Sequence, residues 1–268
     1  FENEKNDNRY VTLSRTANLS RQLSLFFKLH INRILLEGGC SINGQDKHPR
    51  NVCICYSGGD DLFIVGAWNE VVELAVDVRR AFSKFTQETL SLSAGIGLYE
   101  HDYPVSAGAK EVAQLEDAAK RLPDKNAVTV FEAEWKGIKI IKGEKKERKE
   151  KRGTYYWREF EEEVLGEKLK VLREFLQGSE DRGMSFIYNL LELLRSPEEK
   201  INFARYVYIL SRLEPGREAK PEKKEAYLNF TKKMYPWYKK EEDRRQLITA
   251  IYLYVYLNRQ KEEPSHEG

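Results

Sequence analysis

The sequence has few cysteines and no long apolar run. Three cysteines in 268 residues are too few for a disulfide framework, and this number indicates a reducing compartment. No apolar stretch approaches the roughly 18 residues of a membrane-spanning helix, and the mean hydropathy is −0.65. The sequence therefore predicts a cytoplasmic protein that makes no membrane contact.

The sequence also lacks an excess of either charge. It has 45 Lys and Arg against 43 Asp and Glu, which gives a formal net charge of +2. Because a protein that coats nucleic acid carries a large positive excess, we expect any basic surface here to be local. The chain opens at Phe1 without a signal-like apolar segment, and we interpret it as a piece of a longer protein.

The first half of the chain alternates helical and strand patterns. Apolar residues at helical spacing predict helices at 11–36, 69–88 and 106–121. Short apolar, β-branched runs predict strands at 51–56, 62–65, 91–98 and 127–131. The first two strands form a hairpin, and the preceding segment at 38–50, which is rich in turn residues, is expected to be a loop.

The second half shows only helical patterns after a charged stretch. Residues 142–152 have no periodic apolar face, and interleaved glutamates dilute their basic charge. We therefore favour a solvated linker over a nucleic-acid contact. Helices are predicted at 155–177, 184–195, 197–213, 221–235 and 241–260. The predicted organisation is an α/β domain at 1–136, a linker at 137–153 and a helical domain at 154–268.

The hairpin turn, Ser57-Gly58-Gly59-Asp60-Asp61, carries the clearest chemical signal. Its glycines let the backbone approach a ligand closely. The two adjacent carboxylates repel each other unless a cation joins them. Hard oxygen ligands at a turn suit Mg²⁺, which keeps waters and also binds phosphate oxygens. The motif predicts a metal–nucleotide site for phosphoryl transfer, with a purely structural turn as the alternative.

The three cysteines do not predict a metal site. Cys40, Cys53 and Cys55 lack the spacing of zinc ligands. Cys53 and Cys55 alternate on one face of the first predicted strand, and we expect both to lie in the core.

The motif and its neighbours resemble known families. A strand, a GGDD turn and a strand between helices resemble the palm of nucleotide cyclases and polymerases. Residues 12–131 resemble the diguanylate cyclase domain in element order, with Leu92-Ser-Ala-Gly-Ile96 at its post-hairpin strand and Ala118-Ala-Lys120 at its phosphate-binding lysine.

A closer resemblance covers nearly the whole chain. Two segments resemble the second palm domain of the large subunit of type III-A (Csm-type) CRISPR effector complexes: Ser14-Arg-Thr-Ala-Asn-Leu-Ser-Arg-Gln-Leu-Ser-Leu-Phe-Phe27 and Cys55-Tyr-Ser-Gly-Gly-Asp-Asp-Leu-Phe-Ile-Val-Gly66. The helical half resembles the C-terminal helical domain of that subunit by position and pattern.

This resemblance implies an α+β fold: a ferredoxin-like palm of the cyclase and polymerase type, followed by an all-α helical bundle. The family's palm begins with an Asp-rich strand that supplies further metal ligands, and we expect this first strand to be missing from the chain. The implied activity is that of a cyclic oligoadenylate synthetase, which joins ATP through 3′–5′ phosphodiester bonds when the complex holds target RNA. Because that site needs two palms, we expect this chain alone to be inactive.

The resemblance also implies roles for individual residues. Asp60 and Asp61 would be the catalytic residues and would hold Mg²⁺ or Mn²⁺. The implied nucleotide contacts are Ser20 to the adenine, Ser57, Gly58 and Gly59 at the turn, and Lys120, supported by Lys125, to the phosphates.

The implied partners are the first palm and the nuclease domain of the same protein, and the other complex subunits, including the small helical subunit. The crRNA and the target RNA would be contacted through the complex. Two other functions stay open. A diguanylate-cyclase-like enzyme would use GTP, but the Gly-Gly-Asp-Asp turn and the helical half argue against it. A non-catalytic palm scaffold is the other, against which the intact Asp60 and Asp61 argue.

Overall fold

The computed structural model describes residues 12–42, 48–132, 134–141, 144–151, 153–176, 184–196 and 200–262. These residues divide into two compact units. The first unit holds residues up to Leu92 together with Leu98–Lys110, and the second holds Ser93–Gly97 and the chain from Glu111 onward. The predicted domain boundaries at 136 and 153 stay predictions.

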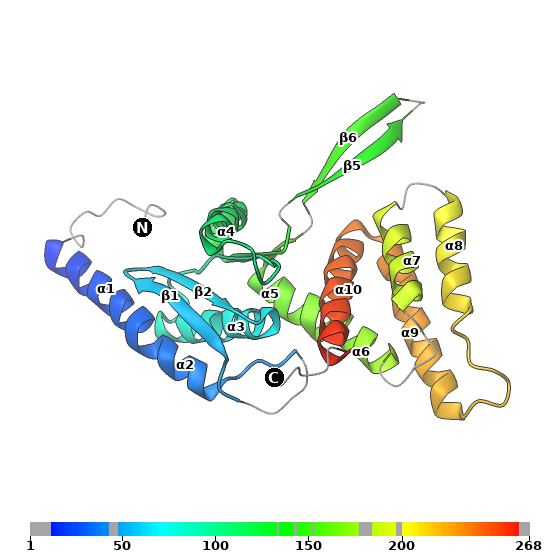
Figure 1. Ribbon diagram of the computed structural model, residues 1–268, viewed down its shortest axis with the longest axis horizontal. Coiled ribbons are helices and arrows are strands. Elements are labelled where there is room, and N and C mark those ends of the chain that lie inside the picture. Colours follow the sequence, from blue (N-terminus) through cyan, green and yellow to red (C-terminus); the bar gives the residue numbers. More distant parts are fainter. Residues whose placement is uncertain are drawn as a thin grey trace. The chain divides into compact units, whose positions relative to one another are not determined.

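A long helix opens the first unit. Helices α1 (Leu13–Leu25) and α2 (Ile31–Glu37) are joined by a π-helical turn, η2 (Phe26–His30), so the helix predicted at 11–36 is confirmed (Figure 1). Thr12 caps the helix, because its side-chain oxygen accepts a hydrogen bond from the Arg15 backbone N–H at 3.3 Å.

The predicted hairpin follows. Strand β1 (Val52–Gly58) pairs antiparallel with β2 (Asp61–Gly66), and α3 (Trp68–Phe85) comes next. One face of the hairpin packs on the helices (Figure 1). The residues of that face are Val52, Ile54, Leu62 and Ile64, and they meet a buried cluster of Phe26, Phe27, Ile31, Leu74, Val78 and Phe82. This apolar contact fixes the hairpin on the helix pair.

The other face of the hairpin is exposed. Cys53 and Cys55 are both exposed, so the expectation that they lie in the core is wrong. Tyr56 and Val65 are also exposed, by 56% and 39%. The physical reason is that the helices of the first unit cover only one face of the two strands, and alternate strand positions point to opposite faces.

A three-stranded sheet belongs to the second unit. Its order is β3 (Ala94–Ile96), β4 (Ala127–Val130) and β7 (Thr154–Tyr156), with β3 parallel and β7 antiparallel to β4. Helix α4 (Val105–Lys120) and a short 3₁₀ turn, η3 (Pro123–Lys125), stand between β3 and β4 in the chain. Because β7 follows residue 153, the expectation that the second half has no strand is wrong there.

The charged stretch predicted as a linker also forms strands. Strand β5 (Glu134–Ile141) pairs antiparallel with β6 (Glu144–Lys151) along its whole length. The reason lies at the base of this hairpin. Val130 N–H donates to the Gly153 carbonyl at 2.8 Å, and Gly153 N–H donates to the Glu132 carbonyl at 2.9 Å. The chain therefore leaves and returns at one point, and its two arms pair with each other.

The rest of the second unit is helical, as predicted. Its helices are α5 (Trp157–Glu159), η4 (Phe160–Leu169) and α6 (Lys170–Leu176), which form one continuous helix, then α7 (Met184–Arg195), α8 (Lys200–Ser211), α9 (Pro221–Lys239) and α10 (Glu241–Glu262). Helix α10 packs against η4, α9 and α7, and the rings of Phe175 and Phe230 stack at 3.9 Å. Among the described residues, no helix combines the length and the apolar character needed to cross a bilayer.

Candidate functional site

The hairpin turn is built by glycine. The pairing of Gly58 with Asp61 leaves Gly59 and Asp60 as the two turn residues. Gly59 has φ +65°, and a positive φ at the first central residue is what a two-residue turn of type II′ requires. A Cβ on Gly59 would meet no atom within 4 Å. Gly59 is therefore needed for its backbone conformation, and the space beside it is open.

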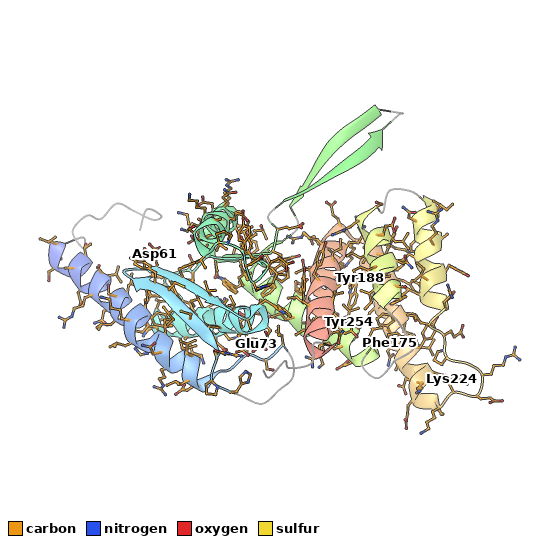
Figure 2. The ribbon with its side chains drawn as sticks, viewed as in Figure 1. Asp61, Glu73, Phe175, Tyr188, Lys224 and Tyr254 are labelled. Atoms are coloured by element: carbon orange, nitrogen blue, oxygen red, sulfur yellow. The ribbon has the colours of Figure 1, made fainter. Side chains whose placement is uncertain are left out.

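Asp60 and Asp61 stand at this tip, where both are exposed, and Figure 2 labels Asp61. Asp60 lies in the turn and Asp61 opens β2. The described residues contain no group of three His, Cys, Asp or Glu side chains placed to share a metal ion. Two carboxylates nevertheless fit Mg²⁺ or Mn²⁺, because Mg²⁺ is commonly held by one or two carboxylates together with waters and substrate phosphates.

A β-bulge decides which side chains share the face of Asp61. Ile54 pairs with Ile64, but the next pair is Tyr56 with Phe63, so β1 has one extra residue at Cys55. An extra residue shifts the alternation of the strand. As a result Ser57 faces the helices, where its hydroxyl donates a hydrogen bond to the Phe27 carbonyl at 2.6 Å.

The structure brings four of the predicted residues together: Gly58, Gly59, Asp60 and Asp61 form the tip of the hairpin. Ser57 is adjacent in sequence, but its hydroxyl is engaged by the helix. Ser20 is exposed on α1 of the same unit.

The two predicted lysines lie in the second unit. Lys120 ends α4 and forms an ion pair with Glu116 at 2.8 Å. Lys125 is exposed and has φ +48°, and its carbonyl accepts a hydrogen bond from the Ser93 hydroxyl at 2.5 Å. The roles of Ser20, Ser57, Lys120 and Lys125 stay predictions.

Sequence reasoning missed a buried charge cluster behind the hairpin. Arg50, whose side chain is 2% exposed, pairs with Glu73 and, at 2.9 Å, with Asp77, and it donates to the Cys40 carbonyl. The carboxylate of Asp77 also accepts the backbone N–H groups of Gly39 and Cys40, at 2.9 and 2.7 Å. The cluster thus ties the loop before β1 to α3.

The cluster changes the pKa of Glu73, and the spacing of its acidic residues in the sequence points to it. Burial raises the pKa of Glu73, although a hydrogen bond from the Ile42 backbone N–H and the charge of Arg50 favour its ionised form. Glu70, Glu73 and Asp77 recur at helical spacing in the first three turns of α3, where most of the other residues are apolar. Acids on a helix face that is expected to be buried are the signal that points to such a cluster.

A helix-backed hairpin with two carboxylates at a glycine turn defines the palm class, which includes nucleotide cyclases and polymerases. Two family models match the chain: Cas10/Cmr2, second palm domain, at residues 1–129, and CRISPR RNA silencing complex Cmr2 subunit, second helical domain, at residues 173–260. The chain belongs to the Cas10 family of large subunits of type III CRISPR complexes, and its similar relatives are of subtype III-A.

One such relative is the CRISPR system single-strand-specific deoxyribonuclease Cas10/Csm1 of Mycobacterium tuberculosis. It is 40% identical over 262 residues, which are 97% of this chain and 30% of the relative. The chain therefore spans about a third of the length of this relative.

Solved structures share the fold. The Csm1–Csm4 cassette in complex with cA4 matches with a TM-score of 0.61 and 23% identity, over 91% of this chain and 33% of that one. The cassette in complex with one ATP matches with a TM-score of 0.56 and 25% identity, over 89% and 33%. These matches confirm the predicted fold class, a ferredoxin-like palm followed by an all-α helical bundle.

Proposed function

We propose that this chain supplies one palm of a cyclic oligoadenylate synthetase, which joins ATP through 3′–5′ phosphodiester bonds in a type III-A CRISPR complex activated by target RNA. The observation that carries the proposal is the exposed pair Asp60 and Asp61 at the hairpin tip of a chain of the Cas10 family. The similarity to a cassette in complex with one ATP supports ATP as the substrate.

The carboxylates of Asp60 and Asp61 would hold Mg²⁺ or Mn²⁺, which neutralises phosphate charge when bound. In the reaction, the 3′-oxygen of one nucleotide bonds to the α-phosphorus of the next ATP. Pyrophosphate leaves with the electron pair of the broken P–O bond, and the 3′-hydroxyl proton passes to solvent. The task of the hairpin is to present both carboxylates in a fixed geometry, which its apolar face secures.

The remaining assignments belong to the same proposal. Gly58, Gly59 and the backbone of Ser57, whose hydroxyl is bonded to the Phe27 carbonyl, contact the nucleotide at the turn. Ser20 contacts the adenine, and Lys120, supported by Lys125, binds phosphate. The partners are the first palm and the nuclease domain of the same protein, the other complex subunits, including the small helical subunit, and the crRNA and target RNA. The complex acts in the cytoplasm.

The test is product analysis by mass spectrometry. The complete effector complex, given ATP, Mg²⁺ and complementary target RNA, is expected to make cyclic oligoadenylates. Asp60→Ala/Asp61→Ala is expected to abolish them. The control Asp102→Ala/Asp117→Ala removes the same charge from two other exposed positions and is expected to keep full activity.

Each other outcome has a meaning. Formation of a cyclic diguanylate from GTP instead would favour the diguanylate-cyclase-like alternative. A correctly assembled complex that makes no product from either nucleotide would favour a palm scaffold. The isolated chain is expected to be inactive, and ATP turnover by it that Asp60→Ala/Asp61→Ala abolishes would contradict the need for a second palm.

A further inference from the structure

We propose that Tyr56 is a nucleotide-binding residue of this site, whose phenolic hydroxyl donates a hydrogen bond to a triphosphate oxygen of the nucleotide at Asp60 and Asp61. The inference rests on the proposed function and names a contact within the same site. Tyr56 stands outside the Gly-Gly-Asp-Asp motif, and three features of the hairpin place it there.

The first feature is the bulge at Cys55. In a regular strand Tyr56 would share the face of Ile54, which packs on the helices. The extra residue instead places the pair of Tyr56 and Phe63 on the face opposite the pair of Ile54 and Ile64. Asp61 precedes Phe63 by two residues, so it lies on the same face as Tyr56. Bulges next to active sites commonly re-aim a side chain in this way.

The second feature is the direction of the Tyr56 ring. A Cβ built on Gly58 would lie 3.0 Å from the Tyr56 hydroxyl oxygen and 3.2 Å from its Cζ. The ring therefore extends along β1 toward the turn and rests against Gly58. Because Gly58 is the cross-strand partner of Asp61, the hydroxyl lies beside the position from which the Asp61 carboxylate projects.

The third feature is the availability of the hydroxyl. Tyr56 is 56% exposed, and no hydrogen bond joins its hydroxyl to another residue in the described part of the chain. Carboxylates and triphosphate oxygens are both acceptors only, so a site built from Asp60 and Asp61 needs donors as well as a cation. A phenol supplies a donor without adding charge at neutral pH.

A role of Tyr56 in stabilising the hairpin can be distinguished from a role in nucleotide binding. Tyr56 and Phe63 are cross-strand partners, and two aromatic side chains at such positions can stabilise a hairpin through their rings. Tyr56→Phe keeps the ring and removes only the hydroxyl, so the two roles separate in this variant.

The experiment compares the assembled complex carrying Tyr56→Phe with the unchanged complex, in the presence of target RNA. A hydrogen bond to a charged group contributes enough binding that its loss is expected to raise the KM for ATP about tenfold, with kcat little changed. The unfolding midpoint is expected to stay the same. Tyr208→Phe, at a tyrosine that is 63% exposed on α8, is the control. An unchanged KM in Tyr56→Phe would overturn the inference.

A double-mutant cycle tests the geometry. The methyl group of Gly58→Ala would lie 3.0 Å from the Tyr56 hydroxyl oxygen, so the phenol must shift by a few tenths of an ångström, and the KM for ATP is expected to rise. In a Tyr56→Ala background the same change has no phenol to displace, so its effect on the KM is expected to be smaller, and what remains measures the contact of Gly58 itself with the nucleotide. An equal effect of Gly58→Ala in both backgrounds would contradict the placement of the ring.

The two proposals fail in different ways. A complex that binds ATP but makes no cyclic oligoadenylate would refute the proposed function. Equilibrium titration of that complex and its Tyr56→Phe variant with ATP and with adenosine still tests the contact. Weaker binding of ATP alone supports a triphosphate contact, and equal ATP affinity refutes it.

Discussion

Replacement of Arg50 by methionine is expected to destabilise the first unit strongly. Methionine provides a long, unbranched apolar side chain like the stem of arginine. The substitution removes the guanidinium that pairs with Glu73 and Asp77 in the described cluster. Glu73 and Asp77, whose side chains are 2% and 8% exposed, then lose their shared cation. The hydrogen bond from Arg50 to the Cys40 carbonyl is lost as well.

The size of the effect follows from what remains. Removing one partner of a buried ion pair costs about 3–5 kcal/mol. Asp77 keeps hydrogen bonds from two backbone N–H groups, and Glu73 keeps one from the Ile42 N–H at 2.6 Å. Both carboxylates therefore retain part of their hydrogen bonding without Arg50. We therefore expect a loss near the lower limit, about 3 kcal/mol in the free energy of unfolding.

The loss is expected to depend on pH. Burial already raises the pKa of Glu73 above 4.5, and without Arg50 that pKa rises further. A carboxyl whose pKa is raised in the native state lowers the free energy of unfolding as the pH rises above its unfolded pKa, and this loss levels off above the native pKa. The Glu73 part of the penalty of Arg50→Met should therefore be small below the native pKa of the unchanged protein, which lies above 4.5. It should grow from there up to the higher native pKa of the variant and stay constant above it. It should be larger at pH 8 than at pH 5.

Urea unfolding at both pH values, combined with hydrogen exchange of the α3 amides, measures this effect. Arg33→Met is the matched control, because Arg33 pairs with Glu37 on an exposed helix face, with side chains 72% and 61% exposed, and we expect little change. The reasoning is refuted if Arg50→Met is no less stable than Arg33→Met, or if its loss in the free energy of unfolding is the same at both pH values. The buried ion pairs of Arg50 would then not stabilise the first unit.

Two further predictions concern a half-buried thiol and a buried ammonium group. Burial raises the pKa of the Cys40 thiol to about 12 from 9.0, so its thiolate fraction at pH 8 falls about a thousandfold. Alkylation followed by mass spectrometry should therefore label the exposed Cys53 well before Cys40. Equal alkylation rates would contradict the burial of the Cys40 thiol. Lys168, with a side chain 2% exposed, lies 2.9 Å from Asp243 and 5.2 Å from the Trp237 ring. Because Asp243 keeps 17% exposure, Lys168→Met is expected to lower the free energy of unfolding by about 2 kcal/mol. Urea unfolding followed by tryptophan fluorescence measures this loss, and an unchanged midpoint would refute it.

The sequence was sufficient for the features that depend on local chemistry. A two-residue turn with glycine at its first position is set by backbone sterics, so Asp60 and Asp61 could be placed at the tip. The helix at 11–36 and the C-terminal helices were predictable because their apolar residues recur at helical spacing over many turns.

Features that depend on pairing between residues far apart in the chain could not be predicted from the sequence. Regular alternation puts Cys53, Cys55 and Ser57 on one face, whereas the bulge breaks this pattern because β1 and β2 pair with unequal lengths. The position of a bulge is decided by the partner strand and the helices beneath it. For this reason the face of Tyr56 cannot be predicted from alternation, and the exposure of Cys53 depends on which face of the hairpin the helices cover.

Gly153 makes the β5–β6 hairpin independent of the sheet that it interrupts. A side chain at this position would overlap the carbonyl oxygens of Val130 and Glu132, so β4 and β7 close against each other at a point that only glycine allows. The register of the sheet is then the same for an insertion of any length between them. The β5–β6 hairpin can therefore change in length or in charge during evolution while Thr154 continues to pair with Thr129 across the strands. It is also a suitable position for a fluorophore or an affinity tag.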